Sequence, residues 1–321
     1  MSPIAQPALP SFEVHLTAPD IGRWLPGNTG VRGFITRDSG VAGPHVALLA
    51  IAHGNEIAGA IVLGRLLETR LSPTRGRLTF GFVNPDAYER FDPRQPTASR
   101  FIDEDINRVW DVAVLDSTRR STELDRAREI RPLIDTVDVL FDLHSMLWPS
   151  DPLILCGTSP KGKRLALGAG VPALVVADHG HASGRRIIDY SRFADAATPC
   201  AASLVEAGQH WQDATVNTMF ASVAGLLGHL DVAVADATLP QRDAQKQRFA
   251  EVTMAVTAAT SSFAFVQRYR GGDVIARRST LIAVDGETEI RTPYDDCLMI
   301  MPSLRPSRGH TAVRLARFVE Q

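Results

Sequence analysis

Along most of the chain, short apolar runs of strand length alternate with longer segments whose apolar residues recur at helical spacing. The clearest run is 46–52, and it is followed by helical periodicity over 57–67, a second run at 78–83 and an amphipathic helix predicted at 121–134. Further strand-like runs occur at 137–143, 153–156, 173–177 and 202–205, and a further helix is predicted at 215–230. This alternation predicts an α/β fold with a mixed, largely parallel central sheet flanked by helices.

The pattern changes near residue 240. From residue 249 onward, Val, Thr, Ile and Arg dominate and turns follow one another closely, which is typical of an all-β structure. We therefore expect a first domain over 1–240, whose N-terminal segment 1–40 is β-rich, and a small β domain over 241–321.

The composition and charge of the chain limit the kinds of binding partner and the cellular compartment that we expect. Of the 321 residues 45% are hydrophobic and 22% charged, the formal net charge is -2, and the basic residues are dispersed. Neither a nucleic acid nor an anionic membrane is therefore an expected partner. No apolar run reaches the roughly 18 residues that span a bilayer, and the N-terminus lacks a signal-peptide pattern. The three cysteines are widely spaced and form no CxxC pair, so we expect a cytoplasmic protein.

A candidate metal site is formed by three residues that come just after predicted strands. His53 and Glu56 follow the first apolar run, and His144 follows the run that begins at residue 137. In open α/β sheets the ligand crevice lies at the carboxyl ends of the strands, so we expect these side chains to meet there. Two imidazoles and a carboxylate suit zinc, and Asp142 could hydrogen-bond His144 from outside.

The histidines alone do not decide the chemistry, because a histidine after a strand is more often an ordinary hydrogen-bonded residue than a ligand. His179 and His181 also have a metal-like spacing. Their surroundings indicate a loop, however, so we rank this pair below the first set.

Four motifs together are more specific: HGNE at 53–56, RFIDEDINR at 100–108, DLH at 142–144 and EAG at 206–208. In order and approximate spacing they resemble the motifs of the aspartoacylase and succinylglutamate desuccinylase family, which belongs with the zinc carboxypeptidase-like hydrolases. The resemblance extends over about residues 45–210, and the β-rich tail is consistent with the family's C-terminal domain. It implies one zinc ion per chain, held by His53, Glu56 and His144.

The resemblance also implies roles for the other motif residues. Glu206, in a Glu-x-Gly setting after an apolar strand, would take a proton from the attacking water and return it to the leaving nitrogen. Arg100 would stabilise the oxyanion, and Asn107 and Arg108 would hold a substrate carboxylate. Asp105 would orient these groups. The ordinary alternatives are a salt-bridged glutamate and a solvated, arginine-rich loop.

The amino-acid half of the substrate is left open by departures from the family pattern. Members of the family use a further arginine shortly before the catalytic glutamate, and the candidates Arg185, Arg186 and Arg192 do not lie in a matching motif. A tyrosine from the C-terminal domain helps in some members, and Tyr294 is the nearest candidate here.

We therefore expect a zinc-dependent hydrolase that deacylates an N-acyl amino acid or a related small N-acyl amine. A zinc carboxypeptidase acting on peptide C-termini and a non-catalytic small-molecule-binding relative are the alternatives. Every expected ligand and Glu206 are present, which argues against a non-catalytic relative. A homo-oligomer is compatible with the sequence, which does not specify the oligomeric state, the acyl group or the amine product.

Overall fold

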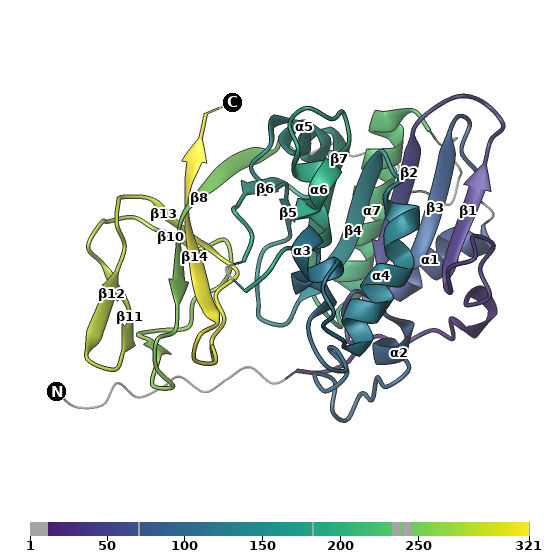
Figure 1. The fold of residues 1–321 in the computed structure, drawn as a ribbon. Helices are drawn as coiled ribbons and strands as arrows, with labels where there is room; N and C mark the ends of the chain where they lie inside the picture. The colour runs from purple at the N-terminus through teal and green to yellow at the C-terminus, as the bar shows by residue number, and fades with distance from the viewer. Residues whose placement is uncertain (1–11, 70, 182, 233–238, 240–245, 321) are drawn as a thin grey trace. The chain divides into compact units, whose positions relative to one another are not determined.

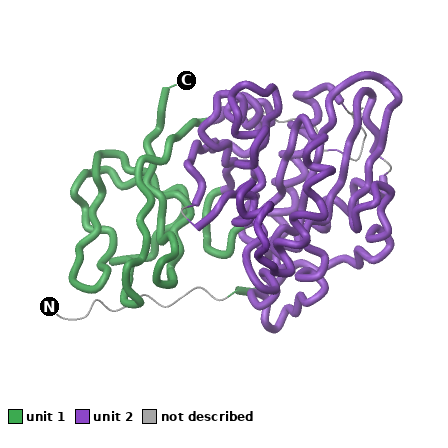
Figure 2. Tube along the Cα trace, in the orientation of Figure 1, with its two compact units in different colours: residues 1–13, 146–151, 248–321 green, residues 14–145, 152–247 purple. Residues whose placement is uncertain are grey.

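The computed structural model describes residues 12–69, 71–181, 183–232, 239 and 246–320. Two compact units are distinguished (Figure 2). The larger unit comprises residues 14–145 and 152–247, and the smaller comprises residues 1–13, 146–151 and 248–321. The larger unit is α/β and the described part of the smaller unit is built from β strands.

The larger unit is built on a sheet with the strand order β1-β3-β2-β4-β7-β5-β6. Its strands are β1 (Phe34–Asp38), β2 (His45–Ala50), β3 (Arg77–Phe82), β4 (Val139–Met146), β5 (Leu153–Leu155), β6 (Leu174–Ala177) and β7 (Ala201–Gln209). β2 pairs in parallel with β3 and β4, and β5 pairs in parallel with β6, whereas β1 is antiparallel to β3 and β5 to β7. The predicted mixed, largely parallel sheet is confirmed.

Helices cover both faces of this sheet, with α4 on one face and α1 and α7 on the other (Figure 1). Crossovers between parallel strands are right-handed almost always, and those from β2 to β3 and from β3 to β4 run in opposite directions, so their helices fall on opposite faces. The helices are α1 (Ile57–Glu68), α2 (Pro85–Tyr88), α3 (Val112–Leu115), α4 (Thr122–Ile134), α5 (Pro160–Ala169), α6 (Ser191–Ala194) and α7 (Asp213–Leu230), with the 3-10 helices η1 (Gly22–Trp24), η2 (Ile106–Arg108) and η3 (Ile187–Asp189).

Local sequence explains why the elements near the strand ends form where they do. Every residue of β2 is buried, as expected for a central parallel strand that is covered on both faces. A Cβ atom at Gly59 would lie 2.8 Å from the Cβ of Ala50, so the glycine lets α1 pack closely on β2. α4 begins at the predicted cap, because the Ser121 hydroxyl accepts a hydrogen bond from the Leu124 amide at 3.0 Å.

The smaller unit has the antiparallel strand order β8-β14-β13-β10 and a separate antiparallel sheet β12-β11-β9. Its strands are β8 (Arg248–Thr257), β9 (Ala264–Phe265), β10 (Val274–Ile275), β11 (Leu281–Asp285), β12 (Thr288–Arg291), β13 (Cys297–Ile300) and β14 (Thr311–Val319). Phe263, Phe265, Tyr269 and Tyr294 contribute aromatic side chains to its core. The predicted all-β character of the tail is confirmed, while the predicted domain boundary at 240/241 lies outside the described residues.

Two regions differ from the sequence prediction. In the described part of the segment 1–40, expected to be β-rich, β1 is the one strand and η1 precedes it, because Pro26, Gly27 and Gly30 turn the chain. α5 was not predicted, since its two glycines and two lysines obscure the helical periodicity. No helix in the described part of the chain is long and apolar enough to cross a membrane.

Candidate active site

The three predicted metal ligands come together at the carboxyl ends of β2 and β4. His53 lies in the turn after β2, and Glu56 is the residue that immediately precedes α1. His144 lies inside β4 and not after it as predicted, because this strand continues to Met146. β2 and β4 are parallel neighbours with Ala50 opposite Leu143, so both strands deliver their polar residues to the same edge.

The donor atoms of these residues lie close enough to share one metal ion. Glu56 Oε1 is 2.6 Å from His53 Nδ1, and Glu56 Oε2 is 3.0 Å from His144 Nδ1. The ligand atoms of the three residues all lie within 4.8 Å of one another, and all three side chains are buried. This is the group of histidine, cysteine and carboxylate residues that meets the spacing of a metal site within the described ranges. A buried pair of imidazoles with a carboxylate fits zinc.

Each of the two imidazoles also has a carboxylate on its other side. His53 Nε2 lies 3.0 Å from Asp105 Oδ1, and His144 Nε2 lies 2.7 Å from Asp142 Oδ2. Such outer carboxylates fix the tautomer and ring orientation of ligating histidines, and here they leave Nδ1 of each ring facing Glu56. Burial alone would lower the pKa of His144, but Asp142 and Glu56 outweigh it and raise that pKa well above its usual value.

Glu206 lies inside β7, on a fully buried stretch of strand. Within the described residues its Oε2 atom is buried and has no hydrogen-bond partner. Burial raises the pKa of Glu206 to about 8, against the opposing effect of His144 and with a further contribution from Glu56. An unpaired carboxyl with a raised pKa beside a donor set is the arrangement expected of a proton-transfer group.

Arg100 lies beside the same cluster. Its Nη2 atom is 2.9 Å from His53 Nε2 and 3.2 Å from Asp105 Oδ2, and its Nη1 atom is 3.5 Å from Glu56 Oε1. The side chain is 38% exposed, so a donor edge remains accessible to a substrate. Arg100 therefore lies beside the donor set, and its predicted role in stabilising the oxyanion stays a prediction.

Asn107 and Arg108 lie on η2 and contact the outer carboxylates. Asn107 is buried, its Nδ2 atom lies 3.2 Å from both Asp142 Oδ2 and His144 Nε2, and its Oδ1 atom accepts from the Ile187 amide at 2.8 Å. Arg108 donates to the Asn107 carbonyl at 2.7 Å and lies 3.6 Å from Asp105. In this structure the Asn107 amide bonds protein atoms, and its predicted contact with a substrate stays a prediction.

The three arginines considered for the substrate pocket have different surroundings. Arg186 is buried, with both terminal nitrogens on Asp178. Arg192 bonds the Asp135 carbonyl and Cys200. Arg185 is the more exposed, with 55% of its side chain accessible and Asp111 at 3.0 Å.

Tyr294 lies in the smaller unit. Its hydroxyl is 2.5 Å from that of Thr253, and its ring lies under the Arg317 guanidinium at 3.9 Å. Its predicted part in substrate binding stays a prediction.

A hydrogen-bonded pair next to the site was missed by sequence reasoning. The Ser145 amide donates to Glu56 Oε2 at 3.1 Å, and the Ser145 hydroxyl lies 2.8 Å from His210 Nδ1. Burial lowers the pKa of His210 to about 3, so this ring is neutral at physiological pH. The sequence signal was weak, because His210 follows Glu206 by four residues without forming any motif.

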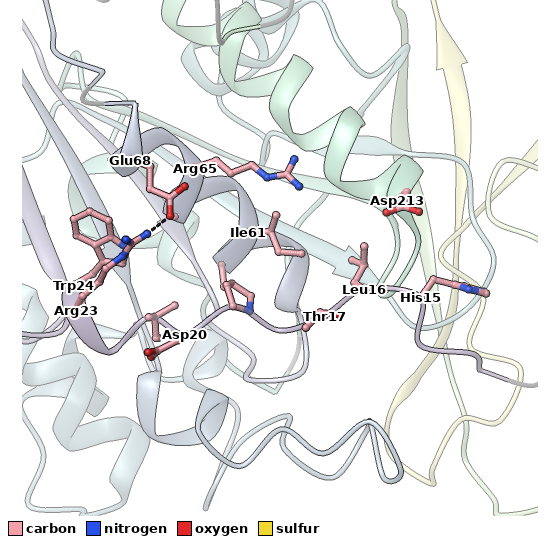
Figure 3. A pocket seen from close by; sticks show the side chains of 14 residues that line it. His15, Leu16, Thr17, Asp20, Arg23, Trp24, Ile61, Arg65, Glu68 and Asp213 are labelled. Atoms are coloured by element: carbon pink, nitrogen blue, oxygen red, sulfur yellow. Dashed lines mark hydrogen bonds and ion pairs between the residues drawn. The ribbon is translucent and has the colours of Figure 1, made fainter.

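A pocket of about 360 Å³ lies elsewhere on the larger unit, along the outer face of α1. Its lining includes Trp24, Ile61, Arg65 and Asp213, and the side chains shown in Figure 3 include none of the candidate site residues. Arg23 and Glu68 pair at one side of it. This pocket is therefore separate from the candidate site, which is identified by its donor set and its charged residues.

Residues 42–196 match the family described as the succinylglutamate desuccinylase/aspartoacylase catalytic domain. This match covers 155 of the 321 residues of the chain. The family consists of hydrolases that deacylate N-acyl amino acids, and the predicted resemblance to it is confirmed. The match includes His53, Glu56, His144 and the motif 100–108 and ends before Glu206, whose assignment therefore rests on its own surroundings.

Solved structures share the fold. A succinylglutamate desuccinylase from Vibrio cholerae is similar with a TM-score of 0.70 and 16% identity, over 90% of this chain and 86% of that chain. A succinylglutamate desuccinylase/aspartoacylase from Rhodobacter sphaeroides has a TM-score of 0.61 and 16% identity, over 90% and 88% of the two chains. A product-bound ectoine utilization protein from Ruegeria pomeroyi has a TM-score of 0.58 and 15% identity, over 88% and 87%. At these identities the likeness concerns the fold.

Proposed function

We propose that this protein is a zinc-dependent hydrolase of a small N-acyl amino acid. Water is added across the amide bond, the C–N bond breaks, and the products are a carboxylate and a free amine. The observation that supports this most directly is the His53, Glu56 and His144 donor set with the unpartnered carboxyl of Glu206 as its electrostatic neighbour.

The chain holds the ion and orients its ligands. His53, Glu56 and His144 provide the ligand atoms, while Asp105 and Asp142 fix the two imidazoles from behind. A zinc ion at this position supplies Lewis acidity, which polarises a carbonyl group and makes a water molecule more acidic.

Glu206 moves the proton in this proposal. Its carboxylate accepts a proton from the attacking water, and the resulting carboxyl donates it to the amide nitrogen as the C–N bond breaks. A pKa near neutrality suits both directions of transfer, and burial is what raises it here. Arg100 donates hydrogen bonds to the carbonyl oxygen as negative charge develops on it. Arg108, with Asn107, holds the carboxylate of the amino-acid half.

A panel of substrates tests the proposal. Purified protein loaded with zinc is offered acetyl and succinyl derivatives of acidic, basic and neutral amino acids. Unmodified dipeptides are offered in parallel as carboxypeptidase substrates, and the release of free amine is measured in both cases. Release of amine from at least one acyl amino acid, but not from dipeptides, is the expected result. Turnover of dipeptides alone would favour a carboxypeptidase, and no turnover of any compound by zinc-loaded protein would favour a non-catalytic relative.

A further inference from the structure

The loop between β3 and α4 supplies four of the polar residues around the donor set, yet it has little regular structure of its own. In addition to α2, α3 and η2, it consists of turns and irregular backbone. Arg100, Asp105, Asn107 and Arg108 all lie on it. A long irregular loop must be fixed from outside if its side chains are to hold a defined geometry.

The Glu123 side chain of α4 provides a fixed point for this loop. Its carboxylate is fully buried. Oε1 accepts from the Ile102 amide at 2.6 Å and from Asn84 Nδ2 at 3.2 Å, and Oε2 accepts from the Asp103 and Glu104 amides at 3.0 and 3.2 Å. Three successive backbone N–H groups therefore converge on one carboxylate, which is a characteristic anion-binding geometry.

A carboxylate of the loop in turn accepts hydrogen bonds from the same end of α4. Asp103 Oδ2 accepts from the Thr122 amide at 2.7 Å and from the Thr122 hydroxyl at 2.6 Å. Both carboxylates lie near the first turn of α4, where the helix dipole favours negative charge. The helix end and the loop thus fix each other through bonds in both directions.

The same loop backbone reaches the metal ligands within a few residues. The Arg100 carbonyl accepts from the Gly54 amide at 3.1 Å, between His53 and Glu56. A Cβ atom at Gly54 would lie 2.4 Å from the Ser99 carbonyl oxygen, so the two segments are in close contact. A shift of residues 102–104 would therefore be passed to the Arg100 guanidinium on one side and to the Asp105 carboxylate on the other.

Charge compensation makes the Glu123 contact directional. Within the described residues Glu123 forms no ion pair with an arginine, lysine or histidine, so the buried charge is compensated by N–H groups alone. Hydrogen bonds from three successive amides depend on distance and angle, so they require one defined position of the loop backbone.

We propose that Glu123 is a positioning residue for the reaction: it fixes the loop so that Arg100 and Arg108 face the substrate and Asp105 supports His53. The inference rests on the proposed function for the roles of the two arginines. Glu123 itself does not touch the substrate in this proposal and acts through residues 102–104.

The test compares Glu123→Gln with the matched control Glu129→Gln. The first substitution would turn an NH2 group toward backbone donors. Glu129 is a half-exposed residue of the same helix that pairs with Arg126 and, in the described part of the chain, bonds no residue of the loop. Four quantities are measured on full-length zinc-loaded protein: amide exchange at residues 102–104, zinc affinity, and KM and kcat on the best acyl amino acid.

For Glu123→Gln, amide exchange at residues 102–104 is expected to become at least about tenfold faster, with exchange in β2 and β4 unchanged. KM is expected to rise about tenfold or more and zinc affinity to fall, because the arginines and Asp105 lose their positions. Glu129→Gln should match the wild type. Unchanged exchange, or faster exchange with unchanged KM and zinc affinity, would overturn the inference.

Failure of the proposed function has a different signature. If zinc-loaded wild type hydrolyses no acyl amino acid, the proposed function fails while exchange and zinc affinity still decide whether Glu123 supports the loop and His53. Should Glu123→Gln fail to fold, Glu123→Asp, which keeps the charge but withdraws it by one methylene, is measured instead against the same expectations.

Discussion

At the scale of single residues, the two imidazoles of the site have oppositely charged partners within hydrogen-bond distance, whereas in the described part of the chain the carboxyl of Glu206 has none. Each imidazole of the donor set lies between Glu56 and an outer carboxylate, so a proton or a cation on it is compensated. Glu206 has no such partner among the described residues, and burial keeps its pKa near 8. A group with a pKa in this range can both accept and release a proton near neutral pH. Burial of the Glu206 carboxylate lowers the stability of the folded state, while the raised pKa that results suits proton transfer.

Glu206→Gln should lower kcat by about 10²- to 10⁴-fold, because the variant cannot accept the proton of the attacking water. Zinc content should stay near that of the wild type, since Glu206 is not proposed as a ligand. Amine release and zinc content measured on the same samples check both statements. Loss of zinc together with activity would instead make Glu206 a ligand or a structural residue.

The same substitution should stabilise the zinc-free protein at high pH. The folded pKa of Glu206 lies above the unfolded value of about 4.3, so the folded state binds the extra proton between these values and stability falls as pH rises through this window. The neutral glutamine removes this loss. Urea unfolding of zinc-free wild type and variant at pH 5 and pH 8.5 should therefore show a larger advantage of the variant at pH 8.5. An equal difference at both pH values would contradict the assigned pKa shift.

Arg108→Lys should raise KM for a carboxylate-bearing substrate by about tenfold to a hundredfold, because an ammonium group cannot reproduce the planar fork of a guanidinium. Arg120→Lys is the matched control, since Arg120 is 77% exposed and pairs only with Asp125 among the described residues. Steady-state kinetics of both variants give the comparison. An unchanged KM in Arg108→Lys would remove Arg108 from the binding site.

At the scale of elements, the arrangement of β2 and β4 could be predicted from their continuous apolar runs. His53 and Glu56 could be assigned because they follow such a run within four residues, and a motif this local can be recognised from the sequence alone. Glu123 could not be assigned, because its partners at 102–104 are about twenty residues away and nothing in the helix pattern marks a buried acid. The His144 position inside β4 was missed for a related reason, since strand ends depend on pairing partners.

β2 also contains a histidine that should make stability depend on pH. His45 is buried, with Nε2 2.7 Å from the Thr79 hydroxyl and Nδ1 3.1 Å from the Thr136 carbonyl. Burial lowers its pKa, with a smaller contribution from Arg77. The unfolded chain therefore binds a proton near pH 6.5 before the folded protein does, so stability is fully present above this pH and is lost as pH falls below it.

His45→Gln should reduce this loss. Between pH 7.5 and pH 5.0, the wild type should lose more free energy of unfolding than the variant, because only the wild type has a buried imidazole with a lowered pKa at this position. Urea unfolding curves at both pH values measure it, with the exposed His310→Gln as control. Parallel losses in wild type and His45→Gln would show that His45 does not titrate differently in the folded state.

At the scale of the whole molecule, the family match and the donor set point to the same part of the chain. The match covers residues 42–196 and the donor set lies entirely in the larger unit. The all-β tail was predictable as a class from its turn spacing, but a role for Tyr294 rests on the family resemblance, because no motif surrounds this residue in the sequence. The account of catalysis therefore rests on the larger unit and on the zinc ion that we propose for its donor set.

The most direct test of this account is a zinc titration of metal-free protein during hydrolysis of the best acyl amino acid. Amine release should be absent without metal, should rise in proportion to added zinc and should level off at about one zinc per chain. His144→Ala should abolish this response, whereas His179→Ala, which changes an exposed histidine outside the donor set, should leave it intact. Full turnover by rigorously metal-free protein, or a response that depends on His179 and not on His144, would contradict the account.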